Sequence, residues 1–459
     1  MKKLWYSIGL SLTTLLAQAQ VKPFQQNDRV IFVGNSITEA GAYVSYIYLY
    51  YMTHFPGKKL VILNGGIGGD KASDIYRRLD YDILAKKPNV LVLTFGMNDT
   101  GYFEFNNANA DKTAAERIAT SRSSYQQIEQ RLLQLPGIQK IMMSSSPYDE
   151  TAKFAGNLFP GKTKAMLEVI KFQEEAARKN NWPFADLFRP MSALNQQLQQ
   201  KDSTFTIIGP DRIHPGNAGH LVMASLFLKS QGLNGKPVAE ISINAGTGKL
   251  QQAVNCQVSQ LIASNVKVSF NYLAGSLPFP MDTVARIWGN NQKQSDALNW
   301  IPFTEDFNRE MLQVAGLSGV YNLLIDGHSM GQWSGMALAA GINLATVPET
   351  PQNKQAASIM QLNLLRAELE ARLRRYYWVQ GNFFDKKNLL LQDDAAALDS
   401  IRTAAKKDGM LRFHEENYET ARYKELRTAW LQEIDTIVNM IYTINKPVLH
   451  KIEIVKISR

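Results

Sequence analysis

Apolar residues between positions 28 and 232 follow two alternating patterns. Short β-branched apolar runs are separated by stretches in which apolar residues recur every three or four positions. The first pattern is typical of buried strands and the second of amphipathic helices. The expected strands are Val30–Val33, Leu60–Leu63, Val90–Thr94, Ile141–Ser144 and a weaker Phe184–Leu187.

Helical spacing fills the segments between these strands. The expected helices are Tyr43–His54, Ala72–Ala85, Ala115–Leu135, Lys162–Asn180 and Ala218–Lys229. Regular alternation of strand and helix predicts a doubly wound parallel sheet. In such a sheet, ligands bind at the carboxyl ends of the strands.

The pattern changes after Gly232, where alternating strand-like segments begin. These are Val238–Asn244, Val254–Leu261, Val266–Leu273 and Val320–Ile325, which together predict a β-rich domain. From Thr350 the helical spacing returns, in Ala356–Tyr377, Ala395–Lys407 and Tyr418–Tyr442. The last residues, His450–Ser458, alternate again. We expect them to return as a strand to the β-rich domain, which makes the helical segment an insertion in that domain.

The first residues have the features of a secretory signal peptide. Lys2 and Lys3 precede the apolar run Leu4–Leu16, and Ala17-Gln18-Ala19 is a small-x-small cleavage site. We therefore expect a signal peptide (1–19), an α/β domain (20–232), a β-rich domain (233–349), a helical segment (350–448) and a terminal strand (449–459). Because of the signal peptide, we expect a bacterial protein that is secreted or periplasmic.

Composition narrows the classes of function. Cys256 is the only cysteine, so disulfides within the chain and cysteine-ligated zinc are excluded. The net charge of +9 is mild for 459 residues. The sequence has no dense basic run with interleaved aromatics, which is the pattern that would indicate nucleic-acid binding. No later apolar run approaches the roughly 18 residues of a membrane span.

Polar residues suited to chemistry follow three of the strands and precede the last helix of the α/β domain. Ser36 follows the first strand, where a serine is either a helix cap or a nucleophile. The glycine-rich loop Asn64–Asp70 follows the second, where it either cradles phosphate or exposes a backbone N–H to an oxyanion. Asn98 follows the third strand, as a simple turn residue or as an oxyanion donor. Asp211 and His214 share a tight loop, so the carboxylate can orient the imidazole toward a serine.

These blocks together resemble the SGNH (GDSL-type) hydrolase family. The matching residues are Gly34-Asn35-Ser36, the Gly69 loop, Gly96-x-Asn98-Asp99 and Asp211-x-x-His214.

The resemblance implies a flavodoxin-like three-layer sheet and a serine ester hydrolase that needs no metal or cofactor. It implies Ser36 as nucleophile, His214 as base and Asp211 as its orienting acid, with oxyanion donors from Ser36, Gly69 and Asn98. Asn35 departs from the family's usual Asp. We expect this change to tune the site without abolishing activity.

A competing nucleophile motif lies in the β-rich region. Gly327-His328-Ser329-Met330-Gly331 matches the Gly-x-Ser-x-Gly elbow of α/β-hydrolases. That fold requires a parallel sheet around the serine, whereas Asp326-Gly327 between alternating runs is a strong hairpin signal. We therefore expect a hairpin turn here. His54 and His220 lie in helical contexts and are expected to be packed or exposed, without a catalytic role.

Two further groups of side chains suggest contact with a glycan. An arginine-rich stretch is expected to be a solvated helix face, with contact to an acidic glycan as the less favoured alternative; it comprises Arg366, Arg372, Arg374 and Arg375. Trp288, Trp300 and Trp333 suggest a sugar-stacking platform, but core packing is expected for at least two of them.

These features together predict a secreted bacterial esterase. Its expected substrate is an acylated small molecule or polysaccharide, and the favoured reaction removes O-acetyl groups from a carbohydrate polymer. One alternative is a lipid or aryl esterase, similar to lysophospholipases or thioesterases. Another is a glycan-binding protein whose hydrolase domain is inactive.

Overall fold

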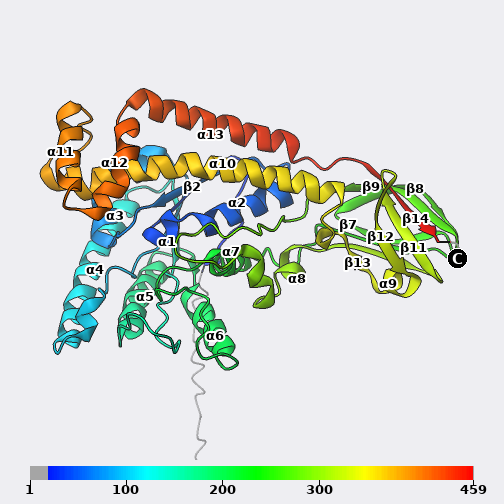
Figure 1. The fold of residues 1–459 in the computed structure, drawn as a ribbon, viewed down its shortest axis with the longest axis horizontal. Helices are drawn as coiled ribbons and strands as arrows, with labels where there is room; N and C mark the ends of the chain where they lie inside the picture. Colours follow the sequence, from blue (N-terminus) through cyan, green and yellow to red (C-terminus); the bar gives the residue numbers. More distant parts are fainter. Residues whose placement is uncertain (1–18, 458–459) are drawn as a thin grey trace, which may run out of the picture.

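The computed structural model describes residues 19–457, so nearly all of the predicted signal peptide lies outside the described residues. A parallel sheet in the order β2-β1-β3-β4-β5 forms the centre of the α/β domain (Figure 1). Its strands are β1 (Arg29–Gly34), β2 (Val61–Gly66), β3 (Val90–Leu93), β4 (Gln139–Met143) and β5 (Phe184–Ala185). The predicted doubly wound sheet is confirmed.

The two faces of this sheet bury alternate side chains of each strand. From β1, Val30 and Phe32 enter one core, while Ile31 and Val33 enter the other. The first core includes residues of α2 (Ala42–His54), α6 (Phe188–Gln199) and α7 (Asn217–Ser230). The second includes residues of α3 (Ala72–Arg78), α4 (Ala110–Leu133) and α5 (Lys162–Lys179). Helices on both faces give the expected three layers.

Two elements of the α/β domain differ from the prediction. The expected helix Ala72–Ala85 ends as an α-helix at Arg78 and continues as a π turn (Leu79–Ile83) and a 3₁₀ turn (Leu84–Lys86). The turns place Asp82 in the interior, where it meets two arginines. The helix α6 was not predicted, because Pro190 lies in its first turn and four of its twelve residues are Asn or Gln.

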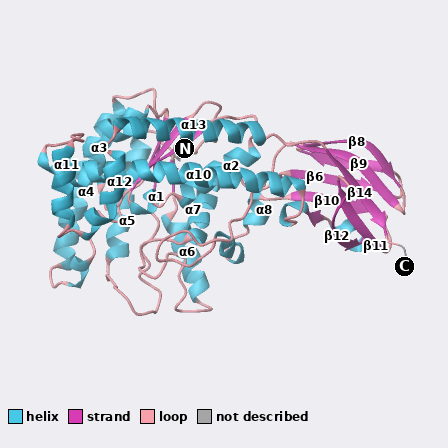
Figure 2. Cartoon of the chain, turned by 45° about the horizontal axis from the view of Figure 1, so that its top comes forward, coloured by secondary structure: helices cyan, strands magenta, loops and turns pink. Residues whose placement is uncertain are grey.

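A β-sandwich occupies the opposite end of the elongated molecule (Figure 2). One sheet has the order β13-β10-β6-β7 and the other β12-β11-β14-β9-β8. The strands are β6 (Ala239–Asn244), β7 (Lys249–Val254), β8 (Cys256–Ala263), β9 (Lys267–Ala274), β10 (Glu310–Ala315), β11 (Val320–Ile325), β12 (His328–Ser334), β13 (Ile342–Asn343) and β14 (His450–Lys456). Since β14 pairs with both β9 and β11, the helical segment is an insertion in this domain, as predicted.

The inserted segment folds over the α/β domain. It comprises α10 (Pro351–Val379), α11 (Ala395–Ala405), α12 (Gly409–Ala421) and α13 (Lys424–Ile444). The single helix expected over Tyr418–Tyr442 is wrong, because the chain turns at Arg422-Tyr423 between α12 and α13. In Figure 1, α10 and α13 run side by side above α2 and β2, and residues of both join the first core. Three short helices complete the fold: α1 (Ser36–Glu39), α8 (Phe303–Phe307) and α9 (Gly335–Ala340).

The arginine-rich stretch of α10 was expected to be a solvated face, which holds for Arg372 but not for two of the other arginines. Arg366 and Arg374 are 2% and 1% exposed. Arg366 pairs with Glu370, and Arg374 forms a two-oxygen ion pair with Asp82 of the α/β domain. Burial of these charges is tolerated because each has a carboxylate partner: Arg366 has Glu370 within α10, and Arg374 has Asp82 across the interface. No helix within residues 19–457 is both long and apolar enough to span a membrane.

Candidate active site

Ser36 lies where β1 passes into the short helix α1. The side-chain oxygen of Asn35 accepts a hydrogen bond from the Ile37 N–H at 3.1 Å and so caps α1. This cap directs the Ser36 hydroxyl away from the helix and toward His214, whose Nε2 lies 2.8 Å from Ser36 Oγ. Asn35, and not Ser36, is therefore the helix cap, and the Ser36 hydroxyl contacts an imidazole.

Asp211 holds the other side of the same imidazole. Its Oδ2 lies 2.5 Å from His214 Nδ1, and its Oδ1 accepts the backbone N–H groups of Ile213 and His214, both at 2.9 Å. Burial favours the neutral carboxyl, but the His214 ring and these N–H groups outweigh it and lower the pKa of Asp211. An ionised Asp211 at neutral pH can orient the ring by accepting a hydrogen bond from its Nδ1.

Arg212 shapes the loop between the two residues, a role that the sequence pattern did not reveal. Its φ of 65° is left-handed, which lets the chain turn tightly enough for Asp211 to reach His214. The buried guanidinium donates to the carbonyls of Asp149 and Ala152, both at 3.0 Å, and of Phe154 at 2.8 Å. These partners lie about sixty residues away in the chain, so local spacing gives no sign of them.

The predicted oxyanion donors lie on loops that leave adjacent strands. Gly34 of β1 is paired with Gly66 of β2, and the Ser36 N–H is in the first turn of α1, where helix N–H groups have no intrahelical acceptor. The Gly69 N–H is used in no backbone hydrogen bond of residues 19–457. Asn98 Nδ2 donates to the Asp70 carbonyl at 2.9 Å, which joins the second and third loops.

Tyr102 and Lys162 fix the Asn98 loop and were not predicted. The Tyr102 hydroxyl donates to Asn98 Oδ1 at 2.5 Å. The NH2 group of the same side chain therefore points away from Tyr102. Lys162 is buried and donates to the carbonyls of Met97 and Gly101, both at 2.6 Å. Burial lowers the pKa of Lys162 to about 7, and nearby carboxylates, which raise this pKa, offset the effect only in part.

A pocket of about 580 Å³ opens over Ser36 and His214. Its walls come from three parts of the chain: the α/β domain, the loop Arg286–Asn290 and the inserted helices. The inserted helices contribute Ala371, Arg375, Met410, Phe413 and His414. The volume suits a ligand of drug or disaccharide size.

Of the three tryptophans, two are packed against other side chains and one is exposed, as the sequence indicated. Trp288 is 98% exposed and lines this pocket. Trp300 packs edge-on against Phe205, and Trp333 packs against the β-sandwich core. Trp288 is therefore the one of the three that is free to stack on a ligand.

The competing serine and His54 lie apart from this chemistry, whereas His220 lines the pocket but accepts the Tyr43 N–H at its Nδ1, at 3.2 Å. Asp326 and Gly327, with φ of 50° and 81°, form the two-residue turn between β11 and β12, and Ser329 Oγ donates to Asn322 at 2.6 Å. The predicted hairpin is confirmed. His54 and His220 are buried, and burial lowers their pKa values to about 4 and about 3, so both stay neutral. In the described part of the chain, no group of three His, Cys, Asp or Glu residues is arranged to hold a metal ion.

Comparisons with known proteins identify two parts of the chain. Residues 32–222 match the model of the GDSL-like Lipase/Acylhydrolase family, and residues 357–446 match that of the Diltiazem deacetylase C-terminal helical domain. A solved gut microbial diltiazem-metabolizing enzyme is 46% identical, with 96% of this chain and 100% of that chain covered and a TM-score of 0.93.

A more distant relative is known for a different substrate. The acetylxylan esterase of Geobacillus stearothermophilus is 24% identical over 226 residues, which is 45% of this chain and 94% of that protein. The family match, the full-length similarity and the fold together lead to one conclusion: the chain belongs to the GDSL-like lipase/acylhydrolase family and is a carboxylic-ester hydrolase.

Proposed function

We propose that this protein is a secreted serine esterase that removes O-acetyl groups through Ser36, His214 and Asp211. The observation that carries the proposal is the unbroken hydrogen-bond chain from Ser36 Oγ through His214 to Asp211. A serine hydroxyl is a weak nucleophile at neutral pH and needs an adjacent base of this kind. The proposed donors for the oxyanion come from Ser36, Gly69 and Asn98.

The proposed reaction has two halves. Ser36 Oγ attacks the ester carbonyl carbon while its proton passes to His214 Nε2, and the carbonyl electrons move onto oxygen. The carbonyl then re-forms, the bond to the alcohol oxygen breaks, and His214 returns the proton to the departing alcohol. Water attacks the acetyl-Ser36 in the same way and releases acetate and free Ser36. General-base transfer of this type contributes about 10²–10⁴-fold to the rate.

For the alcohol, we propose a compact carbohydrate, such as an acetylated oligosaccharide released from a polymer. The exposed Trp288 beside Ser36 offers a face for a sugar ring, and the acetylxylan esterase supports an acetylated glycan. The inserted helices line part of the pocket, so that its walls surround the ligand on more than one side, which favours short glycans over a long chain. Glu39, Arg286 and Arg375 line the pocket with charge, which does not suit a lipid acyl chain.

An acetylated aromatic small molecule is the second candidate. It is favoured by the full-length similarity to the diltiazem-metabolizing enzyme, including the helical segment that lines the pocket. The same tryptophan face suits an aromatic ring.

Hydrolysis of four substrate classes, followed as release of acetate or, for the long-chain ester, of the fatty acid, separates these possibilities. Wild type and Ser36→Ala are assayed on acetylated xylo-oligosaccharides, acetylated xylan and pectin, diltiazem and a long-chain ester. We expect release from the oligosaccharides, lost on substitution. Release from diltiazem alone favours the second candidate, release from lipid esters alone contradicts both, and release unaffected by Ser36→Ala contradicts the mechanism.

Secretion is also part of the proposal and is supported by the signal-like residues 1–19. Expression of the full chain in a Gram-negative host, with fractionation and N-terminal mass analysis, tests it. We expect an extracytoplasmic protein that starts near Gln20. A cytoplasmic protein that retains Met1 would contradict it.

A further inference from the structure

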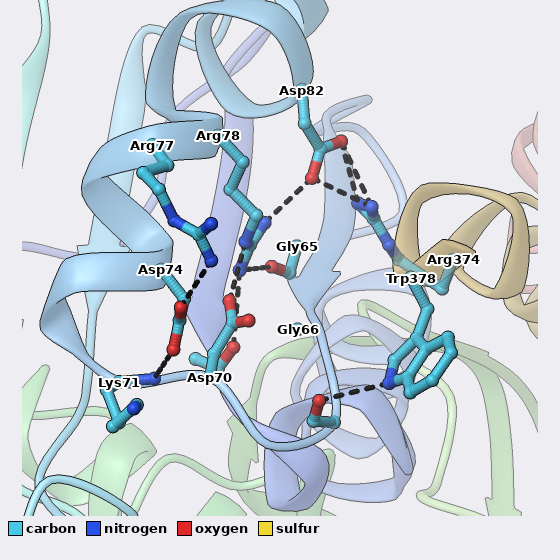
Figure 3. Close-up of polar contacts among 12 residues, drawn as sticks. Gly65, Gly66, Asp70, Lys71, Asp74, Arg77, Arg78, Asp82, Arg374 and Trp378 are labelled. Atoms are coloured by element: carbon cyan, nitrogen blue, oxygen red, sulfur yellow. Dashed lines mark hydrogen bonds and ion pairs between the residues drawn. The ribbon is translucent and has the colours of Figure 1, made fainter. Parts of the chain in front are cut away.

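The inserted helical segment contacts the loop that carries the proposed oxyanion donor. Trp378, at the end of α10, donates its indole N–H to the carbonyl of Gly68 at 3.1 Å (Figure 3). The Gly68 carbonyl and the Gly69 N–H belong to the same peptide group. In a planar trans peptide these two groups point in opposite directions. A donor that holds the carbonyl therefore fixes the direction of the Gly69 N–H.

Two other contacts hold the backbone beside this peptide: the Asp70 N–H donates to the Ile67 carbonyl at 3.2 Å, and the Gly68 N–H donates to the Glu39 carboxylate. Neither involves the Gly68 carbonyl or the Gly69 N–H, so the central peptide of the turn can still rotate. Gly68 and Gly69 have no side chains, and Gly69 has a left-handed φ of +85°. Glycine moves readily between backbone conformations, so rotation of the peptide is cheap. A Cβ placed on Gly69 would meet no atom within 4 Å, so the loop is not packed on that side.

The two flanks of the loop are held within the α/β domain itself. Arg78 donates to the Gly65 carbonyl at 2.7 Å and to the Asp70 carboxylate at 2.6 Å (Figure 3). Asn98 donates to the Asp70 carbonyl. The middle of the loop, at Gly68, is where a residue of the inserted segment provides the hydrogen bond.

Trp378 is itself fixed in place. It is 8% exposed, and the ring of His414 stacks on it with a centroid distance of 4.1 Å and an angle of 20°. One turn earlier in α10, Arg374 binds Asp82, which also binds Arg78 at 2.7 Å (Figure 3). The indole N–H is thus held by the same ion-pair network that holds the start of the loop.

From this geometry we propose that Trp378 is a positioning residue for the oxyanion hole. It fixes and polarises the Gly68–Gly69 peptide so that the Gly69 N–H donates to the oxygen that becomes negative in the transition state. The helical insertion is therefore part of the catalytic apparatus. The inference rests on the proposed function, because it assigns Gly69 as an oxyanion donor.

The test replaces the indole N–H and keeps the ring. Trp378→Phe is assayed with 4-nitrophenyl acetate, and inhibition by an alkylboronic acid, whose adduct with Ser36 places an oxygen in the same hole, is measured in parallel. Complete loss of one oxyanion donor costs about 10²–10³ in kcat, and a misdirected donor costs less. We expect kcat to fall about tenfold with KM unchanged, and boronate affinity to fall in parallel.

Two further variants separate positioning from folding. Tyr376→Phe removes a different hydrogen bond from α10, the one that its hydroxyl donates to Asp393 at 2.8 Å within the helical segment. It should leave kcat unchanged. Should Trp378→Phe unfold, 3-benzothienylalanine at position 378 keeps the indole shape without the N–H and should show the same fall in kcat.

Three results would overturn the inference: wild-type kcat in both position-378 variants, a change in KM alone, or an equal loss of kcat in Tyr376→Phe. Failure of the proposed function has a different signature. In that case Ser36→Ala hydrolyses 4-nitrophenyl acetate as fast as the wild type, whatever the position-378 variants do.

Discussion

Asn35 has a structural role that the family's usual Asp could also fill. It is 3% exposed, and its side-chain oxygen caps the helix that begins with Ser36. We predict that Asn35→Asp keeps the cap and stays within about tenfold of the wild-type kcat/KM, whereas Asn35→Ala loses about 1 kcal/mol of stability. Urea unfolding and 4-nitrophenyl acetate assays check both. An inactive but folded Asn35→Asp would contradict the view that the amide only tunes the site.

Residues with local partners could be predicted at this scale, and residues with distant partners could not. Asp211 and His214 are three residues apart on one loop, so their contact could be predicted once the other blocks of the site were recognised. Arg212 acts through carbonyls about sixty residues away, and Trp378 acts through Gly68 from another part of the fold. Nothing in the local pattern around either residue identifies its partner.

Among the elements, α10 is attached to the α/β domain by the buried Arg374–Asp82 pair. Burial disfavours an ionised Asp82, but Arg374, Lys86 and Arg78 outweigh it and lower its pKa. We predict that Arg374→Met lowers the free energy of unfolding by about 3 kcal/mol, because Asp82 stays buried with less compensation. Urea unfolding measures the loss. Arg372→Met, at an exposed position of the same helix, should change stability by less than about 0.5 kcal/mol.

The strand β10 carries a carboxyl whose protonation should affect stability. Burial raises the pKa of Glu310 to about 7, only partly offset by the hydrogen bond from Tyr272 at 2.7 Å. The folded state thus binds the proton more tightly than the unfolded state. Its stabilisation is fully present below about pH 4.5 and is lost as the pH rises toward 7.

We therefore predict that the wild type loses about 3 kcal/mol more stability than Glu310→Gln between pH 4.5 and 8. Chemical denaturation across this range measures the difference. Glu305→Gln, at an exposed position, should follow the wild-type profile. Parallel profiles for wild type and Glu310→Gln would contradict the assignment.

The type of most elements could be predicted from hydrophobic periodicity. The turn that interrupts a helix, and the element that packs against it, could not. Helical spacing continues through Tyr418–Tyr442, so it gave no sign of the turn at Arg422-Tyr423. In the sequence, the buried arginines of α10 have the pattern of a solvated helix face. Periodicity does not show that another element will cover that face. The i,i+4 partner of Arg366, Glu370, could be seen in the sequence, but the partner of Arg374, Asp82, becomes apparent only in the folded chain.

At the scale of the whole molecule, the pocket is assembled from parts that the sequence predicts separately. The parallel sheet supplies Ser36 and His214, the loop before the second half of the β-sandwich supplies Trp288, and the insertion supplies Phe413 and His414. The sequence predicted the insertion, but not that it lies over the site. That placement depends on packing between α10, α13 and α2, which are far apart in the chain.

Trp288 tests the proposed substrate at this scale. We predict that Trp288→Ala raises KM for acetylated xylo-oligosaccharides several-fold through loss of a stacking face, with kcat little changed. KM for 4-nitrophenyl acetate, which is too small to span the pocket, should change less. Trp333→Ala, in the β-sandwich, is the control and should leave KM unchanged for both. Equal effects on both substrates would argue against a sugar-stacking role.

The central claim is that Ser36 is the nucleophile, and the position of a covalent label tests it most directly. The folded full chain is treated with a fluorophosphonate, and the modified residue is located by peptide mass mapping alongside residual esterase activity. The account predicts a single adduct on Ser36, loss of activity in proportion to labelling, and no adduct in Ser36→Ala. An adduct on Ser329, or full labelling with activity retained, would contradict it.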